Sequence, residues 1–177
     1  MIKRTHLTAL LAAGVIAVAG CGGDSKTKAA DIPAGPAPEA PPAPKASTNL
    51  KDTKSKPTIP RPTGKPPTKL EVKDIVKGTG PPAKKGDQLS MNYVGVTFST
   101  GTEFDASWDR GQPFDLALGQ GDVIKGWDLG LVGIRKGGRR ELTIPAKLAY
   151  GAQGRPPDIG PNEPLVFIVD AVKVSAK

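Results

Sequence analysis

The chain has 177 residues and a formal net charge of +8 at pH 7, but it contains only one Cys and one His. Because these residues, Cys21 and His6, both lie near the start, the composition excludes an internal disulfide, a His/Cys metal site and a Ser-His-Asp or Cys-His catalytic centre. No Walker phosphate loop occurs, so we expect a function that needs no metal, no cofactor and no covalent intermediate.

Charge, proline and aromatic residues divide the chain into two parts. Residues 22–69 hold nine Lys/Arg, four Asp/Glu and 11 of the 19 prolines, whereas residues 70–177 hold 14 Lys/Arg, 13 Asp/Glu and all eight aromatic side chains. Only the second part can bury a core. That part is nearly neutral, and the lysines of the first part are spread out, which favours a role in solubility over contact with an anionic surface. We expect no nucleic-acid partner.

Residues 1–20 have the pattern of a secretory signal peptide. Two basic residues, Lys3 and Arg4, precede an apolar run that is too short for a permanent membrane helix. The run ends in Val18-Ala19-Gly20-Cys21, which resembles a bacterial lipobox. The resemblance implies lipidation of Cys21 and a lipid anchor on the extracytoplasmic face of the cell membrane. The alternative is an ordinary cleaved signal peptide followed by an incidental cysteine.

Residues 21–69, which begin at the lipidated Cys21, are expected to form a disordered linker rich in Pro, Ala and Lys. Proline-rich runs at 33–38 and 41–44 favour extended, solvated chain over helix or strand. We interpret the segment as a tether between the membrane and the folded domain at residues 70–177. A proline-rich ligand for partner domains is the alternative interpretation.

The second part predicts strands separated by turns. Alternating or continuous apolar patterns and turn residues place these strands over residues 70–76, 88–98, 114–118, 139–144 and 165–174. The last is the longest and most apolar, so it is expected at the centre of the sheet. The basic cluster Arg135, Lys136, Arg139 and Arg140 is expected to be a solvated turn and strand edge.

One short helix is predicted within residues 119–131. Val123, Trp127 and other apolar residues recur at helical spacing, and Asp122 has the position of an N-cap. Gly126 and Gly130 weaken this helix by roughly 1 kcal/mol each relative to Ala, so it requires support from the sheet. The expected fold class is therefore α+β, with a curved antiparallel sheet of about five strands wrapped around one short helix.

Seven motifs in the second part of the chain carry a family resemblance. They are Met91-Asn92-Tyr93-Val94-Gly95, Phe104-Asp105-Ala106-Ser107, Asp109-Arg110, Pro113-Phe114, the helix segment 119–131, Ala149-Tyr150-Gly151-Ala152 and Leu165-Val166-Phe167. In this order and spacing they resemble the FKBP-type peptidyl-prolyl cis-trans isomerases, the macrolide-binding immunophilins. The resemblance covers about residues 70–177 and implies a prolyl isomerase domain.

The resemblance also implies a substrate pocket with Trp127 as its floor. The backbone N–H of Ile124 and the hydroxyl of Tyr150 would donate to substrate carbonyl groups, and Asp105 would lie near the twisting amide. The implied catalytic residues are Tyr93, Asp105, Ile124, Trp127 and Tyr150, and the implied substrate-binding residues are Phe104, Arg110, Phe114, Leu116, Val123, Ile159 and Phe167. Taken singly, each residue could be core or surface; together and in family order they indicate a site.

Two positions depart from the family pattern. Leu116 stands where many relatives carry a second aromatic residue, and Arg155 stands where His is frequent. Both would change the rim of the pocket and its macrolide affinity rather than its floor. Trp108 is an added aromatic residue that either contacts the substrate beside its proline or covers the sheet.

The resulting hypothesis is a lipid-anchored, monomeric isomerase that acts on Xaa-Pro bonds of exported proteins. Its partners would be proline-containing peptides, unfolded exported proteins and macrolide inhibitors. The alternative is a chaperone or partner-binding module that uses the same pocket with little turnover, and a spacer domain with a vestigial pocket is a third possibility.

Overall fold

The computed structural model describes residues 46–177, which belong to one compact unit. The expected signal peptide, the expected lipidation site Cys21 and the first half of the expected linker lie outside the described residues. Among residues 46–177, no helix combines the length and the apolar character needed to cross a membrane.

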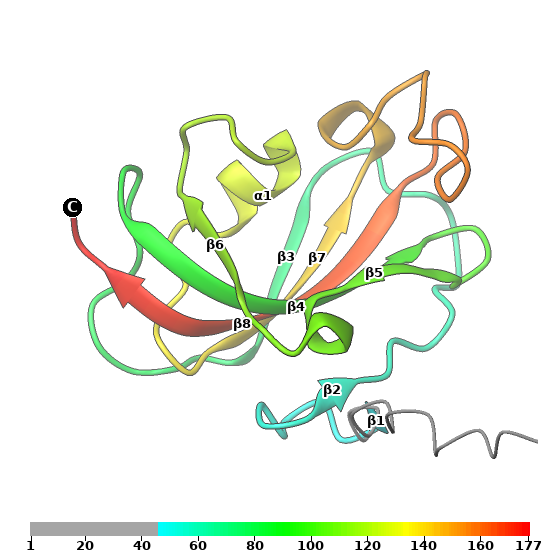
Figure 1. The fold of residues 1–177 in the computed structure, drawn as a ribbon. Coiled ribbons are helices and arrows are strands. Elements are labelled where there is room, and N and C mark those ends of the chain that lie inside the picture. Colours follow the sequence, from blue (N-terminus) through cyan, green and yellow to red (C-terminus); the bar gives the residue numbers. More distant parts are fainter. Residues whose placement is uncertain (1–45) are drawn as a thin grey trace, which may run out of the picture. The chain divides into compact units, whose positions relative to one another are not determined.

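Six strands form the main sheet, and all paired strands in it are antiparallel. They are β3 (Glu71–Val76), β4 (Gln88–Thr97), β5 (Glu103–Ala106), β6 (Phe114–Ala117), β7 (Arg139–Ile144) and β8 (Leu165–Ser175). Their order is β3-β7-β8-β4-β5, with β6 also paired to β4. The sheet curves around the helix α1 (Lys125–Gly130), as Figure 1 shows. This arrangement confirms the expected α+β fold.

Shorter elements complete the described part of the chain. β1 (Ala46–Ser47) and β2 (Lys56–Pro57) form a small parallel pair, and η1 (Ser107–Arg110) and η2 (Ala146–Leu148) are short 3-10 helices. Sequence patterns did not predict β5, because its four residues show only a brief alternation. The main sheet therefore has six strands where about five were expected.

β8 lies at the centre of the sheet, as its length and apolar composition predict. All of residues 165–171 are buried, because both faces of the strand are covered. Leu165, Phe167 and Val169 pack into the main core beside α1, whereas Val166 packs into a second core on the opposite face. The alternation follows from the two-residue period of a strand.

Two glycines let α1 lie directly on β7. A Cβ atom at Gly126 would lie 2.4 Å from Ile144 Cγ2, and one at Gly130 would lie 2.7 Å from Leu142 Cδ2. Both distances are shorter than real carbon–carbon contacts. The glycines that weaken the isolated helix are thus the residues that permit its close contact with the sheet, and this contact fixes the position of Trp127.

Charged side chains hold both ends of α1. The carboxylate of Asp128 accepts hydrogen bonds from the backbone N–H groups of Gly119 (2.8 Å) and Gly121 (3.0 Å), which fastens the loop before the helix. Nη1 of Arg140 donates to the carbonyl groups of Gly130 (2.7 Å) and Val132 (2.9 Å), which are acceptors at the carboxyl end of the helix. The prediction that Asp122 is the N-cap is wrong. Ile124 has the N-cap position, and no side chain forms a capping hydrogen bond with the helix.

Arg139 is also buried, so the prediction of a solvated strand edge is wrong for Arg139 and Arg140. The Arg139 guanidinium is 0% exposed and forms two hydrogen bonds with Asp170, from Nε to Oδ1 (2.5 Å) and from Nη2 to Oδ2 (2.8 Å). It also donates to the carbonyl groups of Leu50 (3.2 Å) and Ser55 (3.1 Å). A buried charge requires such partners because water does not reach it.

These last contacts fix residues 50–61, called the strap from here on, against the face of the sheet opposite α1 (Figure 1). Pro57 is buried, Ile59 packs on the second core, and Arg61 Nη2 donates to the Ser99 carbonyl at 2.9 Å. The prediction of disorder up to residue 69 is therefore wrong for the strap. The sequence does not predict these contacts, because they are made by backbone carbonyl groups and two apolar side chains that follow no periodic pattern.

The close contact between helix and sheet predicts the effect of a single methyl group. Gly126→Ala should raise helix propensity by about 1 kcal/mol, yet we expect it to destabilise the protein by about 1–3 kcal/mol because the methyl group collides with Ile144. Urea unfolding followed by circular dichroism measures the change. Gly160→Ala is the matched control, because its Cβ would meet no atom within 4 Å. A more stable Gly126→Ala protein would contradict the packing described here.

Candidate active site

A cavity of about 660 Å³ opens beside α1. Its walls come from strands β4, β5, β6 and β8, from η1 and α1, and from the loops before α1 and after η2. The lining residues are Tyr93, Phe104, Asp105, Arg110, Phe114, Asp122, Val123, Ile124, Trp127, Tyr150, Arg155 and Phe167. Aromatic and aliphatic side chains supply most of this lining, with polar groups at few positions, as is typical of sites for small ligands and peptide segments.

Five aromatic rings form the apolar part of the cavity. Trp127 packs edge-to-face on Tyr93 (5.1 Å between ring centroids) and on Phe167 (5.3 Å). Phe104 extends the cluster from Phe167 (5.5 Å), and Phe114 extends it from Tyr93 (6.1 Å). Rings that meet edge-to-face are favourably packed, and their different orientations line a concave surface. Trp127 is only 4% exposed, so it forms the base of this surface.

One glycine allows these rings to approach the sheet. A Cβ atom at Gly95 would lie 2.7 Å from Phe104 Cζ and 2.7 Å from Phe167 Cε1. Any larger residue at this position of β4 would displace both rings. Gly95 therefore shapes the cavity wall without contacting the cavity itself.

The polar corner of the cavity lies where the strand paired with β4 changes from β6 to β5. β6 pairs with residues 88–91 of β4, and β5 pairs with residues 94–96. Asn92 and Tyr93 lie between these two segments. The backbone N–H of Tyr93 donates to Ser107 Oγ (2.9 Å), and this hydroxyl donates to Asn92 Oδ1 (3.2 Å). The first residue of η1 is thereby fixed beside Tyr93.

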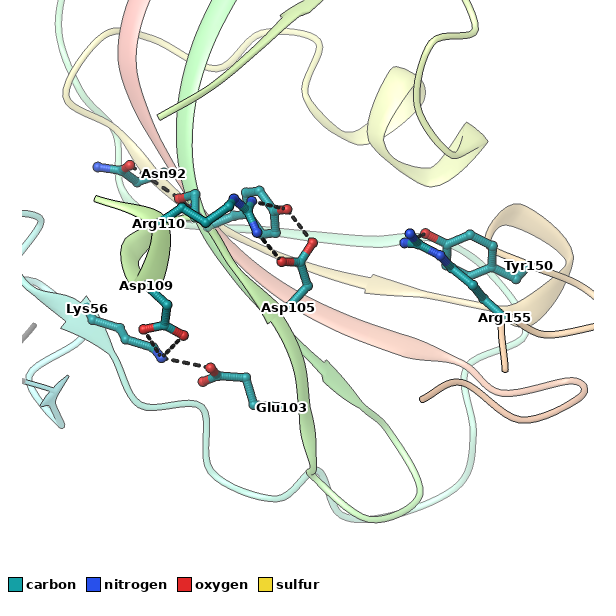
Figure 2. Close-up of polar contacts among 10 residues, drawn as sticks. Lys56, Asn92, Glu103, Asp105, Asp109, Arg110, Tyr150 and Arg155 are labelled. Atoms are coloured by element: carbon teal, nitrogen blue, oxygen red, sulfur yellow. Dashed lines mark hydrogen bonds and ion pairs between the residues drawn. The ribbon is translucent and has the colours of Figure 1, made fainter. Parts of the chain in front are cut away.

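Tyr93, Asp105 and Arg110 form a hydrogen-bonded cluster at this corner (Figure 2). The Tyr93 hydroxyl donates to Asp105 Oδ2 (2.5 Å), Arg110 Nη1 donates to Asp105 Oδ1 (2.5 Å), and Arg110 Nη2 donates to the Tyr93 oxygen (2.8 Å). Burial and the hydrogen bond to Asp105, opposed by Arg110, together raise the pKa of Tyr93 to about 12. Tyr93 is therefore a neutral donor at physiological pH, and the carboxylate is held in one orientation.

The other side of the cavity carries Tyr150 and Arg155. Arg155 Cζ lies 5.8 Å from the centroid of the Tyr150 ring, and Arg155 Nη1 lies 3.5 Å from the Tyr150 hydroxyl oxygen. Figure 2 shows this pair well apart from the Asp105 cluster. The backbone N–H of Ile124, at the start of α1, has no acceptor within residues 46–177. The cavity thus has donor groups of three kinds around an apolar base.

The structure brings together ten of the twelve predicted catalytic and substrate-binding residues in this cavity. The two exceptions are Leu116 and Ile159, which are 4% and 1% exposed and belong to the main core. Leu116 is on β6 but points into the core. Ile159 anchors the loop after η2, where it exchanges two backbone hydrogen bonds with Arg155 (2.8 and 3.0 Å). Their predicted place in the pocket is wrong.

Sequence reasoning assigned Asp122 to a helix cap, whereas the structure places it at the cavity rim. Arg155, predicted at the rim from its loop position, lines the cavity. No pattern in the sequence distinguishes an exposed carboxylate at a rim from one at a helix cap, since both follow a glycine-rich turn. Within residues 46–177, no three His, Cys, Asp or Glu side chains come together as a metal-binding group.

Comparison with known proteins identifies the family of the chain that forms this cavity. Residues 80–172 match the model of the FKBP-type peptidyl-prolyl cis-trans isomerases. The chain belongs to this family. The match spans every residue that lines the cavity, whereas the strap lies before it.

Bacterial and structural relatives of this FKBP support the assignment. It is 54% identical over 120 residues to an FK506-binding protein of Streptomyces anulatus, an alignment that covers 67% of this chain and 97% of that protein. It is 44% identical over 117 residues to a probable FK506-binding protein of Corynebacterium glutamicum, which covers 66% and 97% of the two chains. The crystal structure of AtFKBP13 matches with a TM-score of 0.56 at 37% identity, over 60% of this chain and 94% of that one.

The hydrogen-bonded cluster predicts how the Tyr93 phenol titrates. The Asp105 carboxylate favours the neutral phenol, so Asp105→Asn should lower the Tyr93 pKa from about 12 towards its ordinary value of 10.0. Ultraviolet absorbance of the phenolate measures the titration, in a Tyr150→Phe background that leaves Tyr93 as the single tyrosine. Asp115→Asn, a change of an exposed carboxylate outside the cluster, should leave the titration unaltered. An unaltered titration in Asp105→Asn would contradict the cluster.

Proposed function

We propose that this FKBP catalyses the cis–trans isomerisation of Xaa-Pro bonds in exported proteins. The observation that carries the proposal is the aromatic cavity over Trp127, with the Tyr93–Asp105–Arg110 cluster on one side and Tyr150 on the other. Family membership supports prolyl isomerase activity in general. The cavity size and its mixed lining suit a proline ring with the peptide groups on either side of it.

This reaction requires no bond-making or bond-breaking chemistry, and a cavity of this kind suits it. Rotation about an amide bond crosses a barrier of roughly 20 kcal/mol, and no covalent bond is made or broken. The planar amide is the more charge-separated form, so water stabilises it more than the twisted form. A site that removes water therefore favours the twisted state. A thousandfold acceleration needs about 4 kcal/mol of such differential stabilisation.

In this proposal the residues have separate roles. Trp127 contacts the proline ring, and Phe104, Phe114 and Phe167 keep water from the amide. The Ile124 N–H and the Tyr150 hydroxyl donate to substrate carbonyl groups, which holds the peptide while the prolyl bond turns. Asp105 lies near the turning amide, and its fixed hydrogen bonds with Tyr93 and Arg110 mean that little reorganisation is needed during rotation.

We further propose an extracytoplasmic, lipid-anchored location and a monomeric state. Val18-Ala19-Gly20-Cys21 and the preceding basic and apolar residues support lipidation at Cys21. The anchor would hold the domain near emerging exported chains. We also propose that the cavity accepts macrolides, since two of the relatives are named as FK506-binding proteins.

The isomerase proposal predicts a loss of activity when the base of the cavity is changed. In a protease-coupled assay on Xaa-Pro peptides, the full chain should accelerate isomerisation, and Trp127→Leu should lower kcat/KM by roughly tenfold or more because the proline ring loses its contact surface. Phe98→Leu, a change in the second core on the opposite face, is the control and should keep kcat/KM within about twofold.

Three results of this assay would count against the proposal in different ways. Peptide binding without acceleration would favour a binding module that uses the same cavity. Neither binding nor acceleration would favour a spacer domain. Full activity in Trp127→Leu would place the reaction outside this cavity.

The anchor predicts a change in membrane retention. Cys21→Ser removes the thiol that would carry the lipid, so the variant should appear in the soluble extracytoplasmic fraction while the parent chain remains with membranes. Cell fractionation followed by immunodetection measures the distribution. Ser47→Ala, a small change elsewhere, is the control. Membrane retention of Cys21→Ser equal to that of the parent would overturn the proposed anchor.

A further inference from the structure

Lys56 of the strap joins two carboxylates on the outer side of the candidate site. Its Nζ lies 2.7 Å from Glu103 Oε1, and 2.9 Å from each carboxylate oxygen of Asp109. Figure 2 shows the ammonium group between the two acidic residues. The Lys56 side chain is only 14% exposed, whereas those of Glu103 and Asp109 are 39% and 50% exposed. A bridge with one shielded partner and two acceptors is more constrained than an isolated surface pair.

Both acceptors lie beside residues of the Tyr93–Asp105–Arg110 cluster. Glu103 begins β5, the four-residue strand that carries Asp105, and Asp109 directly precedes Arg110 at the end of η1. The bridge therefore joins the two short elements that supply the carboxylate and the guanidinium. Burial lowers the pKa of Lys56, but its hydrogen bonds to Glu103 and Asp109 outweigh this effect and raise the pKa, so the Lys56 ammonium group is charged at neutral pH.

η1 has few internal means of holding its position. It is a four-residue 3-10 helix without a side-chain cap, and it is followed by Gly111 in the left-handed region at φ 67°. Ser107 holds its start through Tyr93 and Asn92, and Trp108 packs on the second core. Lys56 is the contact that holds Asp109, at the end where Arg110 lies.

Lys56 itself stands on a fixed base. The preceding carbonyl, that of Ser55, accepts a hydrogen bond from the buried Arg139, and the following residue, Pro57, is buried. Further along the strap, Ile59 packs on the same second core as Trp108. The position of the ammonium group is therefore tied to the centre of the sheet through Arg139 and Asp170.

We propose that Lys56 is a positioning residue for the proposed isomerase, and that the strap sets the geometry of the Asp105–Arg110 pair from outside the cavity. The inference rests on the proposed function. Without Lys56, the carboxylate of Asp109 would lose its cation and would compete with Asp105 for the adjacent Arg110. Glu103 and Asp109 would also repel each other. The strap, with Lys56, precedes the family-matched residues 80–172, whereas both acceptors of the bridge lie within them.

The test compares Lys56→Met, Lys56→Arg and Arg61→Met in the full chain. Arg61 also fastens the strap, but its side-chain hydrogen bond goes to the Ser99 carbonyl, which belongs to neither η1 nor β5. In the protease-coupled assay, Lys56→Met should lower kcat by about three- to tenfold with KM little changed, since the substrate-binding rings are untouched. Lys56→Arg should restore most of the rate, and Arg61→Met should match the parent chain.

A second readout does not depend on turnover. Rotation of the Arg110 guanidinium, followed by NMR of isotope-labelled arginine, should be slow in the parent chain, because both terminal nitrogens are hydrogen-bonded. It should become fast in Lys56→Met and stay slow in Arg61→Met. If the parent chain proves inactive, the proposed function fails, but this readout still decides the role of Lys56.

Two results would overturn the inference. In one, Lys56→Met keeps both the parent kcat and slow Arg110 rotation. In the other, Arg61→Met lowers kcat and speeds Arg110 rotation as much as Lys56→Met does, which would show that any loosening of the strap has this effect and that the Lys56 bridge has no specific role.

Discussion

Between residues 91 and 94 the strand pairing at one edge of β4 is interrupted, and the backbone N–H of Tyr93 bonds the Ser107 hydroxyl instead of a neighbouring strand. A buried N–H group requires an acceptor, so this single hydrogen bond holds the start of η1 against β4. Arg110 then lies three residues further along the same short helix, within reach of Asp105 and Tyr93. The interruption thus converts an ordinary sheet edge into the polar corner of the cavity.

The apolar part of the cavity depends on glycines, whose missing side chains allow neighbouring groups to pack closely. Gly126 and Gly130 bring α1 onto β7, and Gly95 leaves room for Phe104 and Phe167 above β4. These glycines reduce helix and strand propensity, and the lost propensity is offset by contacts that place Trp127 between Tyr93 and Phe167. The result is an apolar base next to a fixed polar cluster, which is the combination on which the proposed isomerase function rests.

The fold and most of the cavity could be predicted because they depend on local patterns. β8 and the Trp127 segment have clear apolar periodicity, and the family motifs include most of the lining residues. Leu116 and Ile159 were misplaced because a motif gives the position of a residue in the chain, but not the face to which its side chain turns. Both side chains fill the core instead. These errors affect the wall of the cavity and leave its base unchanged.

The strap could not be predicted for a different reason. Its composition is that of a solvated linker, and its attachment depends on Arg139, a charged residue that sequence patterns assign to the surface. Burial of Arg139 becomes favourable only when Asp170 and the carbonyl groups of Leu50 and Ser55 meet around it. Hydrogen bonds between residues so far apart in the sequence leave no periodic pattern. The strap also carries Lys56, which contacts Glu103 and Asp109 on the outer side of the site.

The central claim is that a proline ring lies directly on Trp127 within the aromatic cavity. Intermolecular nuclear Overhauser effects between an Xaa-Pro peptide and the tryptophan rings test it most directly, since the chain has only two tryptophans, Trp108 and Trp127. Contacts from the proline ring protons to the Trp127 indole, together with upfield shifts of those protons, are the predicted result. A bound peptide whose proline contacts Trp108, or neither indole, would contradict the account.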